Sequence, residues 1–191
     1  MTAQAKKINL LGLSQGDLEQ FLVARSEKPF HARQILQWIY QRDVDDFDQM
    51  TDLSKSLRAQ LNLDAEIVLP QVQARFDSKD VCVKWLFSSG SGQAVETVFI
   101  PEADRGTLCI SSQVGCALDC SFCATGAQGF NRNLASAEII GQVRHAMREL
   151  PRRSKDDPAV SNVVFMGMGE PLANYRNLLP VLELLVSDWA Y

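Results

Sequence analysis

Residues 116–123 read Cys116-Ala-Leu-Asp-Cys120-Ser-Phe-Cys123, and this cysteine loop is the stretch from which the fold class can be argued. The spacing of its cysteines is wrong for a disulfide pair. The loop is also one ligand short of a closed metal site, because a structural zinc or a fully ligated iron-sulfur cube takes four protein ligands. Three thiolates can hold three corners of a 4Fe-4S cluster and leave the fourth iron open. The loop therefore predicts a cluster that binds an exogenous ligand.

A zinc site is the main alternative for these cysteines, with Cys109 or His145 as the fourth ligand. A disulfide framework is disfavoured, because Met1 to Asn9 is polar rather than a secretion signal and the chain is longer than disulfide-scaffold domains. Cys82 is expected to be a buried structural cysteine, the default for a cysteine in a strand. Iron with acid-labile sulfide would support the cluster, and one zinc without sulfide would exclude it.

Composition limits the class of protein. The 191 residues are 46% hydrophobic and 22% charged, which predicts a globular chain with one core or two small ones. No apolar run has the length of a membrane span. Five cysteines without a secretion signal predict a cytosolic location.

The formal net charge of -4 argues against indiscriminate nucleic-acid binding, so any RNA contact must be local. Two groups of basic side chains could make such a contact, although solvated helix faces and a charged loop explain both groups more simply. They are Arg25, Lys28, His31 and Arg33 near the amino terminus, and the run Arg144, Arg148, Arg152, Arg153 and Lys155.

Residues 1–62 show helical patterns and are predicted to form a small helical accessory domain. Ser14 and Asp17 make a capping-box start for a first helix. Apolar spacing predicts a second helix from about 31 to 41. Thr51 is expected to cap a third helix, whose Leu53, Leu57 and Leu61 share one face.

Residues 63–101 contain two alternating runs, 81–87 and 94–100, separated by a turn-rich segment, and they predict a β-hairpin. In the second run, Glu96 shares a side with Val98 and Ile100. Apolar neighbours make a carboxylate hold its proton more tightly, so Glu96 is a candidate base. A glutamate turned to water on an edge strand is an equally good reading of the same pattern.

Residues 102–191 alternate between strand and helix. Strands are predicted over 107–111 and 161–167, and helices over 137–150 and from 173 to about 187. This order indicates an α/β fold with parallel strands joined by right-handed crossovers, the start of a barrel or doubly wound sheet. Reactive loops then lie at the carboxyl ends of the strands. The cysteine loop follows the first of these strands.

A second candidate loop follows the other strand and reads Gly167-Met-Gly169-Glu170-Pro171; we call it the glutamate loop. Glycines at this place let the backbone approach a ligand closely, and Glu170 offers acceptors for an ammonium group. Taken alone, the motif is also typical of an ordinary turn. Its position one strand-helix unit after the cysteine loop favours a binding role.

The spacing Cys-x-x-x-Cys-x-aromatic-Cys, with Phe122 as the aromatic residue, resembles the cluster loop of the radical S-adenosylmethionine (SAM) enzymes, and the glutamate loop resembles the segment that holds the methionyl amino group there. Further segments resemble the RlmN family, adenine C2 methyltransferases of 23S ribosomal RNA and transfer RNA. These are residues 105–116, 123–130, 138–143, and, in the accessory domain, 27–33 and 47–52.

The RlmN resemblance implies a cofactor pair and a set of roles. Cys116, Cys120 and Cys123 would hold a 4Fe-4S cluster, and Gly169 and Glu170 would hold S-adenosyl-L-methionine. One SAM methylates an enzyme cysteine, and a second SAM gives the deoxyadenosyl radical that activates this methyl group for addition to adenine C2. Glu96 matches the proton acceptor, and Cys109 matches the cysteine that releases the enzyme-RNA adduct through a transient disulfide.

The resemblance also implies partners: 23S ribosomal RNA (peptidyl transferase centre), transfer RNA (adenine 37) and a flavodoxin-like reducing electron donor, with no membrane. One departure from the family is serious, since no cysteine follows Cys123 and only two barrel strands precede Tyr191. The chain is therefore interpreted as an amino-terminal fragment with a truncated partial barrel over 102–191, inactive alone. The alternatives are another radical SAM enzyme and a non-catalytic zinc or RNA-binding module.

Overall fold

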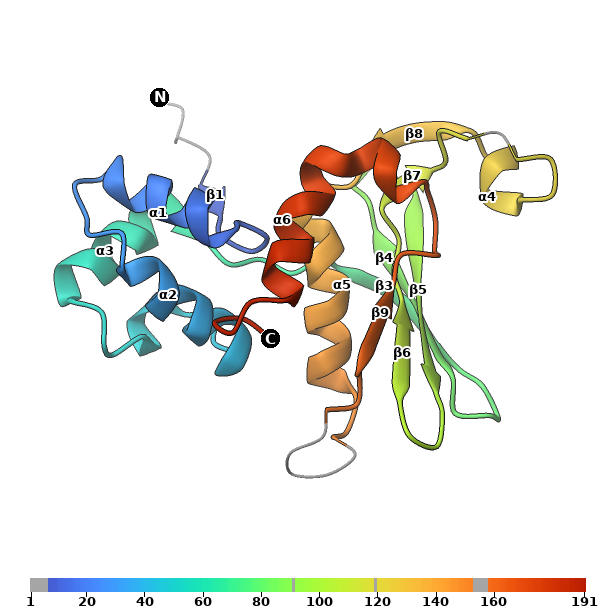
Figure 1. Cartoon of the computed structure of the whole chain (residues 1–191), viewed down its shortest axis with the longest axis horizontal. Helices are drawn as coiled ribbons and strands as arrows, with labels where there is room; N and C mark the ends of the chain where they lie inside the picture. The colour runs from blue at the N-terminus through green and yellow to red at the C-terminus, as the bar shows by residue number, and fades with distance from the viewer. Residues whose placement is uncertain (1–6, 91, 119, 153–157) are drawn as a thin grey trace. The chain divides into compact units, whose positions relative to one another are not determined.

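The computed structural model describes residues 7–90, 92–118, 120–152 and 158–191 (Figure 1). Asp119 of the cysteine loop, and Arg153 and Lys155 of the basic run, lie outside the described residues. The chain forms two compact units. The first unit contains the chain up to Val68 together with Pro180–Tyr191, and the second unit contains Leu69–Leu179.

The first unit is helical, as the sequence predicts. Its elements are β1 (Ile8–Asn9), α1 (Gln15–Val23), α2 (His31–Leu36) with the π-helical turn η1 (Gln37–Gln41), the 3-10 turn η2 (Phe47–Gln49), α3 (Lys55–Asp64) and β2 (Ala65–Glu66), and β1 pairs with β2 in parallel. Apolar faces of the three α-helices supply its core, in which Leu18, Leu22 and Ile35 are fully buried.

Two helix caps were predicted in the first unit; the cap of α1 is confirmed and the cap of α3 is wrong. Ser14 caps α1, and its hydroxyl accepts the Asp17 N–H at 3.2 Å. Thr51 does not cap α3, so that prediction is wrong. Ser54 caps it instead and accepts the Leu57 N–H at 3.1 Å. The helix therefore starts after Leu53, while Leu57 and Leu61 form its buried face.

The second unit is built on one five-stranded sheet. Its strands are β3 (Val72–Asp77), β4 (Val83–Ser88), β5 (Ala94–Pro101), β6 (Gly106–Cys109) and β9 (Asn162–Val164), in the order β3-β4-β5-β6-β9. The predicted hairpin is β4 with β5, and β5 pairs antiparallel with β6, so hairpin and barrel strands share one sheet. β6 and β9 are parallel, as predicted, and α5 (Ser136–Glu149) lies between them in sequence.

Other elements of the second unit surround the carboxyl ends of β6 and β9. They are β7 (Gln113–Gly115), α4 (Ala124–Ala127), β8 (Phe130–Asn133), the 3-10 turn η3 (Pro171–Asn174) and the start of α6 (Tyr175–Leu185). β7 pairs antiparallel with β8. The sequence analysis missed this small ribbon because its strands have only three and four residues. It also missed β3, although Val72, Ala74 and Phe76 alternate there with polar residues.

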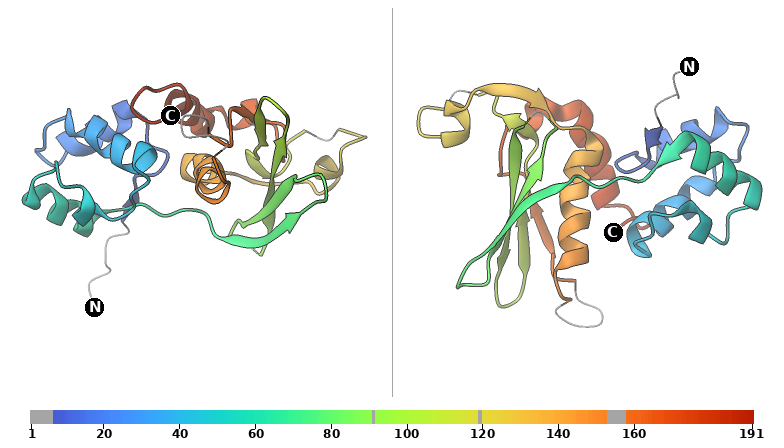
Figure 2. Two further views of the ribbon diagram at one scale, coloured as in Figure 1. Left: turned by 90° about the horizontal axis from the view of Figure 1, so that it is seen from below. Right: turned by 180° about the vertical axis from the view of Figure 1, so that it is seen from behind.

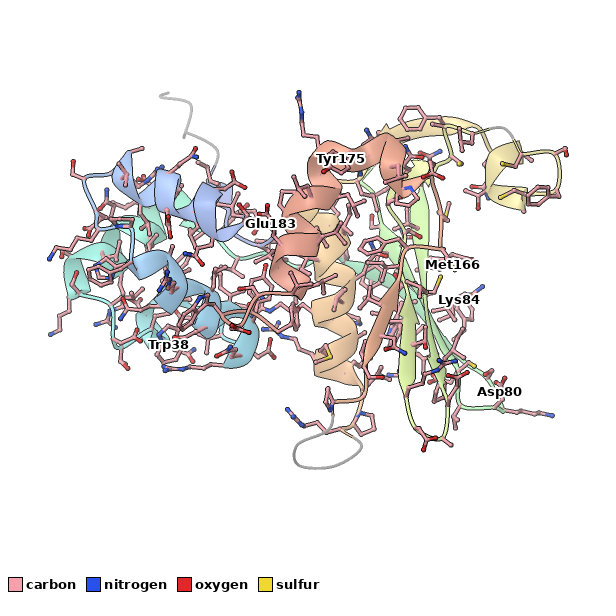
Figure 3. The ribbon with its side chains drawn as sticks, in the orientation of Figure 1. Trp38, Asp80, Lys84, Met166, Tyr175 and Glu183 are labelled. Carbon is pink, nitrogen blue, oxygen red and sulfur yellow. The ribbon has the colours of Figure 1, made fainter. Side chains whose placement is uncertain are left out.

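The two faces of the sheet differ. Val95, Thr97 and Phe99 of β5 are buried on the face that α5 covers (Figure 2), where Thr97 Oγ1 donates to Gln142 Oε1 at 2.6 Å. Trp85 and Phe87 of β4 point the same way and meet His145 edge to face. The opposite face carries Lys84, and Figure 3 shows Lys84 and Met166 on the side away from α5. Among the described residues no helix combines the length and the apolar character needed to span a bilayer.

Candidate active site

The two predicted loops follow the carboxyl ends of the parallel strands β6 and β9, where backbone hydrogen bonds join the glutamate loop to the segment between β6 and the cysteine loop. The glutamate loop runs alongside residues 110–113 in the same direction, as a continuation of the parallel β6–β9 pairing. Gly167 N–H donates to the Ile110 carbonyl at 3.1 Å, and Ser112 N–H donates to the Met168 carbonyl at 2.8 Å. Met168 N–H donates to Ser111 Oγ at 2.8 Å. The glutamate loop is therefore fastened directly to the segment that leads into the cysteine loop.

Glycine is required where the two segments touch. A Cβ on Gly169 would lie 2.4 Å from Gln113 Cβ, and the Gly169 φ of +94° is itself a conformation that favours glycine. A Cβ on Gly167 would lie 2.7 Å from the Ile110 carbonyl oxygen. These glycines were predicted to let the backbone approach a ligand closely. In the structure they let it approach residues 110–113 of the same chain.

The cysteine loop is a compact turn that ends in α4. Cys123 is the N-cap of α4, and its N–H donates to the Cys120 carbonyl at 3.0 Å. Gly126 in α4 lies against the loop, since a Cβ there would meet the Cys120 N at 3.2 Å. All five cysteines of the chain are free and partly exposed, and the aromatic Phe122 is 92% exposed.

Backbone N–H groups point at two of the three loop sulfurs. The N–H groups of Gly126 and Thr125 lower the pKa of the Cys123 thiol below its ordinary value. Leu118 N–H donates to Cys116 Sγ at 3.4 Å. Such hydrogen bonds favour a thiolate, and the thiolate is the form of cysteine that ligates iron. The donor set of the loop therefore fits a cluster held by three thiolates.

The three sulfurs are not gathered around a common point. Within the described ranges, no three His, Cys, Asp or Glu side chains lie close enough together to hold a metal ion. His145, a candidate fourth ligand for zinc, lies on α5 instead, where its Nε2 is 3.0 Å from Glu149 Oε2 and its ring packs against Trp85 and Phe87. The structure thus gives His145 a place in the core of the second unit.

Cys109, the other candidate fourth ligand, lies on the open face of the sheet. It is opposite Val98 of β5 and Val164 of β9. Its side chain is half-buried, and burial raises the pKa of the thiol above its ordinary value. A thiol in this state is mostly protonated at neutral pH and accessible from the open face.

Glu96 shares the open face with Cys109. Cys109 pairs with Val98, two positions along β5 from Glu96, and residues two apart on a strand point the same way. Glu96 has the predicted apolar neighbours, with Val98 on the same side of β5 and Leu86 opposite it on β4, but this face is not buried. The Glu96 side chain is 47% exposed and pairs with Lys84, whose Nζ lies 3.2 Å from Glu96 Oε1. The structure therefore brings Glu96 and Cys109 to one surface and gives Glu96 a lysine partner.

One carboxylate oxygen of Glu170 accepts a hydrogen bond within its own loop. Its Oε1 accepts the Leu172 N–H at 3.0 Å and caps η3, while its own N–H donates to Gln113 Oε1 at 3.0 Å. Gly169 and Glu170 are thus held at the strand ends, beside the root of the cysteine loop. The carboxylate retains acceptor capacity for an ammonium group beyond the Leu172 bond.

Three polar side chains that the sequence reasoning missed organise this region. Ser111, Gln113 and Gln142 are each at most 1% exposed. Gln142 on α5 accepts the Ser111 N–H and donates to the Ser111 carbonyl, both at 2.9 Å. The adjacent run Ser-Ser-Gln before Cys116 was the available signal, because buried polar residues at a strand end must be bonded to something.

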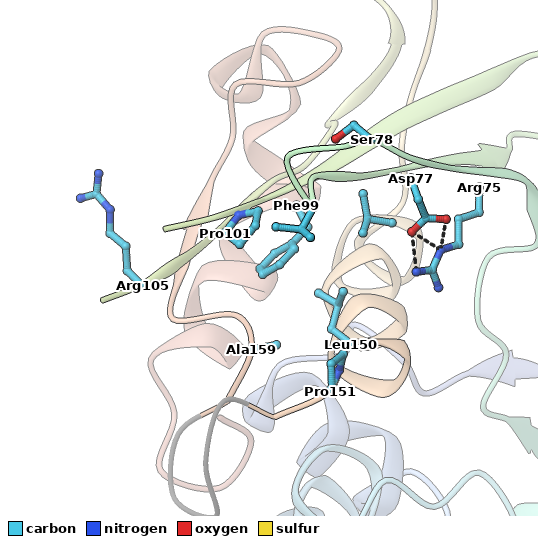
Figure 4. A pocket seen from close by; sticks show the side chains of 11 residues that line it. Arg75, Asp77, Ser78, Phe99, Pro101, Arg105, Leu150, Pro151 and Ala159 are labelled. Carbon is cyan, nitrogen blue, oxygen red and sulfur yellow. Dashed lines mark hydrogen bonds and ion pairs between the residues drawn. The ribbon is translucent and has the colours of Figure 1, made fainter. Parts of the chain in front are cut away.

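A separate pocket of about 370 Å³ opens at the other end of the sheet (Figure 4). Phe99, Pro101, Leu150 and Ala159 line it with mostly apolar surface, and Arg75 and Asp77 pair at its rim. It lies near the amino ends of β6 and β9, whereas both motif loops lie at the carboxyl ends. It therefore contains none of the predicted site residues.

The fold is that of a radical SAM methyltransferase of known structure. A crystal structure of a radical SAM methyltransferase from Sphaerobacter thermophilus superposes with a TM-score of 0.81 and 38% identity, over 96% of this chain and 53% of that one. The family of ribosomal RNA large subunit methyltransferase N-terminal domains matches residues 8–67.

Curated relatives give a more specific comparison. The dual-specificity RNA methyltransferase RlmN of Marinobacter nauticus is 53% identical over all 191 residues and 52% of its own length. The RlmN proteins of Francisella tularensis subsp. novicida and Alcanivorax borkumensis are also 53% identical, over 51% and 50% of their lengths. The chain is thus similar along its whole length to RlmN proteins, and it spans about half the length of the curated relatives it matches.

Proposed function

We propose that this chain supplies the cluster-binding and SAM-binding part of an enzyme that methylates C2 of adenine in 23S ribosomal RNA, at the peptidyl transferase centre, and in transfer RNA, at adenine 37. The observation that carries the proposal is the fastening of the glutamate loop to the root of the cysteine loop at the carboxyl ends of β6 and β9. Reactive loops of barrel enzymes lie at this end of the strands.

In the proposed site, Cys116, Cys120 and Cys123 hold a 4Fe-4S cluster, and Gly169 and Glu170 bind the methionyl part of SAM. The bound pair supplies a carbon radical for adenine C2, a position that offers no nucleophilic lone pair to ordinary methyl transfer. The N–H bonds to Cys123 lower the pKa of its thiol and so favour the thiolate, the form that ligates iron. Glu170 accepts hydrogen bonds from the ammonium group with the acceptor capacity left beyond Leu172.

Glu96 and Cys109 act on the RNA side of the reaction. Glu96 takes the C2 proton, and its ion pair with Lys84 orients the carboxylate on the open face of the sheet. Cys109, as a thiolate, then attacks the enzyme sulfur linked to the methylene carbon. An S–S bond forms while the S–CH₂ bond to the RNA breaks; the electron pair of the broken bond stays with the methylene carbon, which takes up a proton to become the methyl group as the RNA leaves. The cysteine that carries the methyl group is not among the five of this chain, all of which lie at or before Cys123.

The proposal includes the setting of the enzyme. We propose a cytosolic location, a flavodoxin-like reductant that delivers the electron to the cluster, and the two RNAs as substrates. The names of the curated relatives, dual-specificity RNA methyltransferases, support RNA as the substrate class.

The test has two stages. Anaerobic reconstitution of the 191-residue chain should give iron and acid-labile sulfide in cluster stoichiometry. Cys116→Ala, Cys120→Ala and Cys123→Ala should each abolish assembly, whereas Cys82→Ala should not, because Cys82 lies in the turn before β4 and its sulfur faces the Asp80 carboxylate. One bound zinc without sulfide would refute the cluster.

The second stage uses the enzyme at the length of its relatives. It should methylate C2 of adenine in unmodified 23S ribosomal RNA and transfer RNA, detected by mass spectrometry of nuclease digests. The 191-residue chain alone should not. Reductive SAM cleavage without any RNA methylation would point to another radical SAM reaction.

A further inference from the structure

Gln113 is a buried side chain whose single amide oxygen reaches both motif loops. It is 1% exposed at the start of β7. Its Oε1 accepts the Ala117 N–H at 3.2 Å and the Glu170 N–H at 3.0 Å. Ala117 directly follows Cys116 in the cysteine loop, and Glu170 is the candidate SAM-binding residue. One atom thus joins the two halves of the proposed site.

The other end of the amide is anchored. Gln113 Nε2 donates to Asn133 Oδ1 at 2.8 Å, on the neighbouring strand β8. The orientation of the amide follows from its partners, because two backbone N–H groups require the carbonyl oxygen rather than the NH₂ group. The side chain therefore has every polar atom bonded and cannot turn over without losing both loop contacts.

Packing holds Gln113 against the glutamate loop. The Cα of Gly169 lies so close that a Cβ there would be 2.4 Å from Gln113 Cβ and 2.7 Å from its Cγ. The Gln113 backbone N–H also donates to the Met168 carbonyl at 3.2 Å. Gln113 thus contacts residues 168–170 with its backbone, its aliphatic carbons and its amide oxygen. The same amide oxygen also accepts the Ala117 N–H of the cysteine loop.

We propose that Gln113 is a positioning residue that sets the spacing between the cysteine loop and the glutamate loop, so that loading the cluster orders the SAM-binding loop before SAM arrives. This inference rests on the proposed cofactor site. Its physical basis is that a cofactor held at two points binds and reacts well only when both points have the right separation. Misplacement by about 1 Å can cost ~10²-fold in rate.

The decisive measurement is amide hydrogen exchange of the 191-residue chain, with and without the reconstituted cluster. In the wild-type chain, loading the cluster should slow exchange at Glu170 as well as at Ala117, although no SAM is present. Gln113→Met, which keeps the length and removes the amide, should speed exchange at both positions without cluster and should leave Glu170 unresponsive to loading. Its cluster content should stay normal, because no thiolate is touched.

Gln113→Glu is the matched control, since its carboxylate keeps acceptors for both N–H groups and Asn133 can donate to it after an amide flip. It should restore the response of Glu170 to loading. SAM affinity of the loaded protein should fall about tenfold or more in Gln113→Met, the size expected for lost hydrogen bonds, and recover in Gln113→Glu.

The outcomes separate this inference from the proposed function. A wild-type chain that takes up no iron refutes the function, and the exchange of Ala117 and Glu170 without cluster still tests the role of Gln113. A wild-type chain that loads its cluster while Glu170 exchange stays unchanged overturns the inference, even if Gln113→Met fails to fold. Normal SAM affinity in a folded Gln113→Met variant also overturns it.

Discussion

Ser111 Oγ donates a hydrogen bond to the backbone carbonyl oxygen of Glu96 at 2.6 Å, and Ser111 Oγ in turn accepts the Met168 N–H at 2.8 Å. One buried hydroxyl therefore links the strand that carries the candidate base to the loop that carries the candidate SAM-binding residue. Ser111 therefore connects the two parts of the candidate site in the second unit through hydrogen bonds.

Ser111→Ala should destabilise the second unit by about 1–3 kcal/mol, because Met168 N–H then loses its acceptor in a buried place. The neighbouring Ser112 provides the control. Its hydroxyl is buried and has no hydrogen-bond partner among the described residues, so Ser112→Ala should be close to neutral. Urea unfolding midpoints of both variants measure the difference. Equal losses of stability in the two variants would mean that the hydrogen bonds of Ser111 do not stabilise the second unit.

Glu149 should make the stability of the second unit depend on pH. Burial alone raises the pKa of this carboxyl, but hydrogen bonds from Arg75 and Trp85 outweigh burial and lower the pKa below its ordinary value. A carboxyl with a lowered folded pKa stabilises the fold at pH above its ordinary pKa. That contribution is lost as the pH falls below the ordinary value and through the folded one.

Glu149→Gln should therefore lower the unfolding free energy near pH 7, and this deficit should shrink as the pH falls below the ordinary carboxyl pKa and through the lowered pKa of the folded state, where the wild-type carboxyl takes up its proton. Urea titrations across this range check the trend. Asp104→Asn removes an exposed carboxylate from the same unit and should show no such dependence. A constant deficit for Glu149→Gln at every pH would mean that geometry, and not charge, matters at this position.

Gly169→Ala should damage the SAM site more than its backbone strain explains. Gly90 gives the comparison, because its φ is also positive, at +78°, but nothing lies within 4 Å of a Cβ built there. Gly90→Ala should cost ~1 kcal/mol of strain and leave SAM affinity unchanged. Gly169→Ala should cost that much and also weaken SAM binding by more than about tenfold, since Gln113 must move. Calorimetric titration with SAM distinguishes the two variants.

Cys109→Ala, in the enzyme at the length of its relatives, should trap the covalent enzyme-RNA adduct, visible on a denaturing gel. In the wild-type enzyme, release should accelerate as the pH rises, because burial raises the pKa of Cys109 and the thiolate is the attacking form. Cys82→Ala should release RNA normally. Free methylated RNA at full yield from Cys109→Ala would assign Cys109 a structural role.

Glu96→Gln in the same enzyme should slow product release by about 10²- to 10⁴-fold, the usual cost of losing a general base, and leave the cluster intact. Lys84→Met removes the ion-pair partner while keeping Glu96, so it should reduce the rate less. Wild-type turnover in Glu96→Gln would mean that this glutamate is only a solvated surface residue.

The sequence predicts the elements whose patterns are regular. Hairpin alternation, the helical spacing of α5 and the capping chemistry of Ser14 all depend on local rules, and the structure reproduces them. Thr51 and Ser54 are both good caps, and the choice between them depends on where Leu53 packs, which is a tertiary effect. β7 and β8 form because β6 delivers Gln113 beside Asn133, and no local pattern shows that.

Some features of the candidate site can likewise be predicted from the sequence, and others cannot. The cysteine triplet and the glutamate loop are visible as spacing, and their placement after parallel strands follows from topology. The lysine beside Glu96 follows from the β4–β5 register, and the double role of the Gln113 oxygen follows from the way two loops fold back on one segment. Both depend on three-dimensional packing, so residue type and spacing could not predict them.

The strand order of the sheet has a consequence for synthesis on the ribosome. β3, β4, β5 and β6 pair with neighbours that are close in sequence, whereas β9 pairs with β6 across more than fifty residues. Contacts between near neighbours form early, and distant ones wait for the chain to close a long loop. We expect the antiparallel strands to assemble as soon as they emerge, so that the nascent chain displays its cysteines before residues 167–171 have been translated.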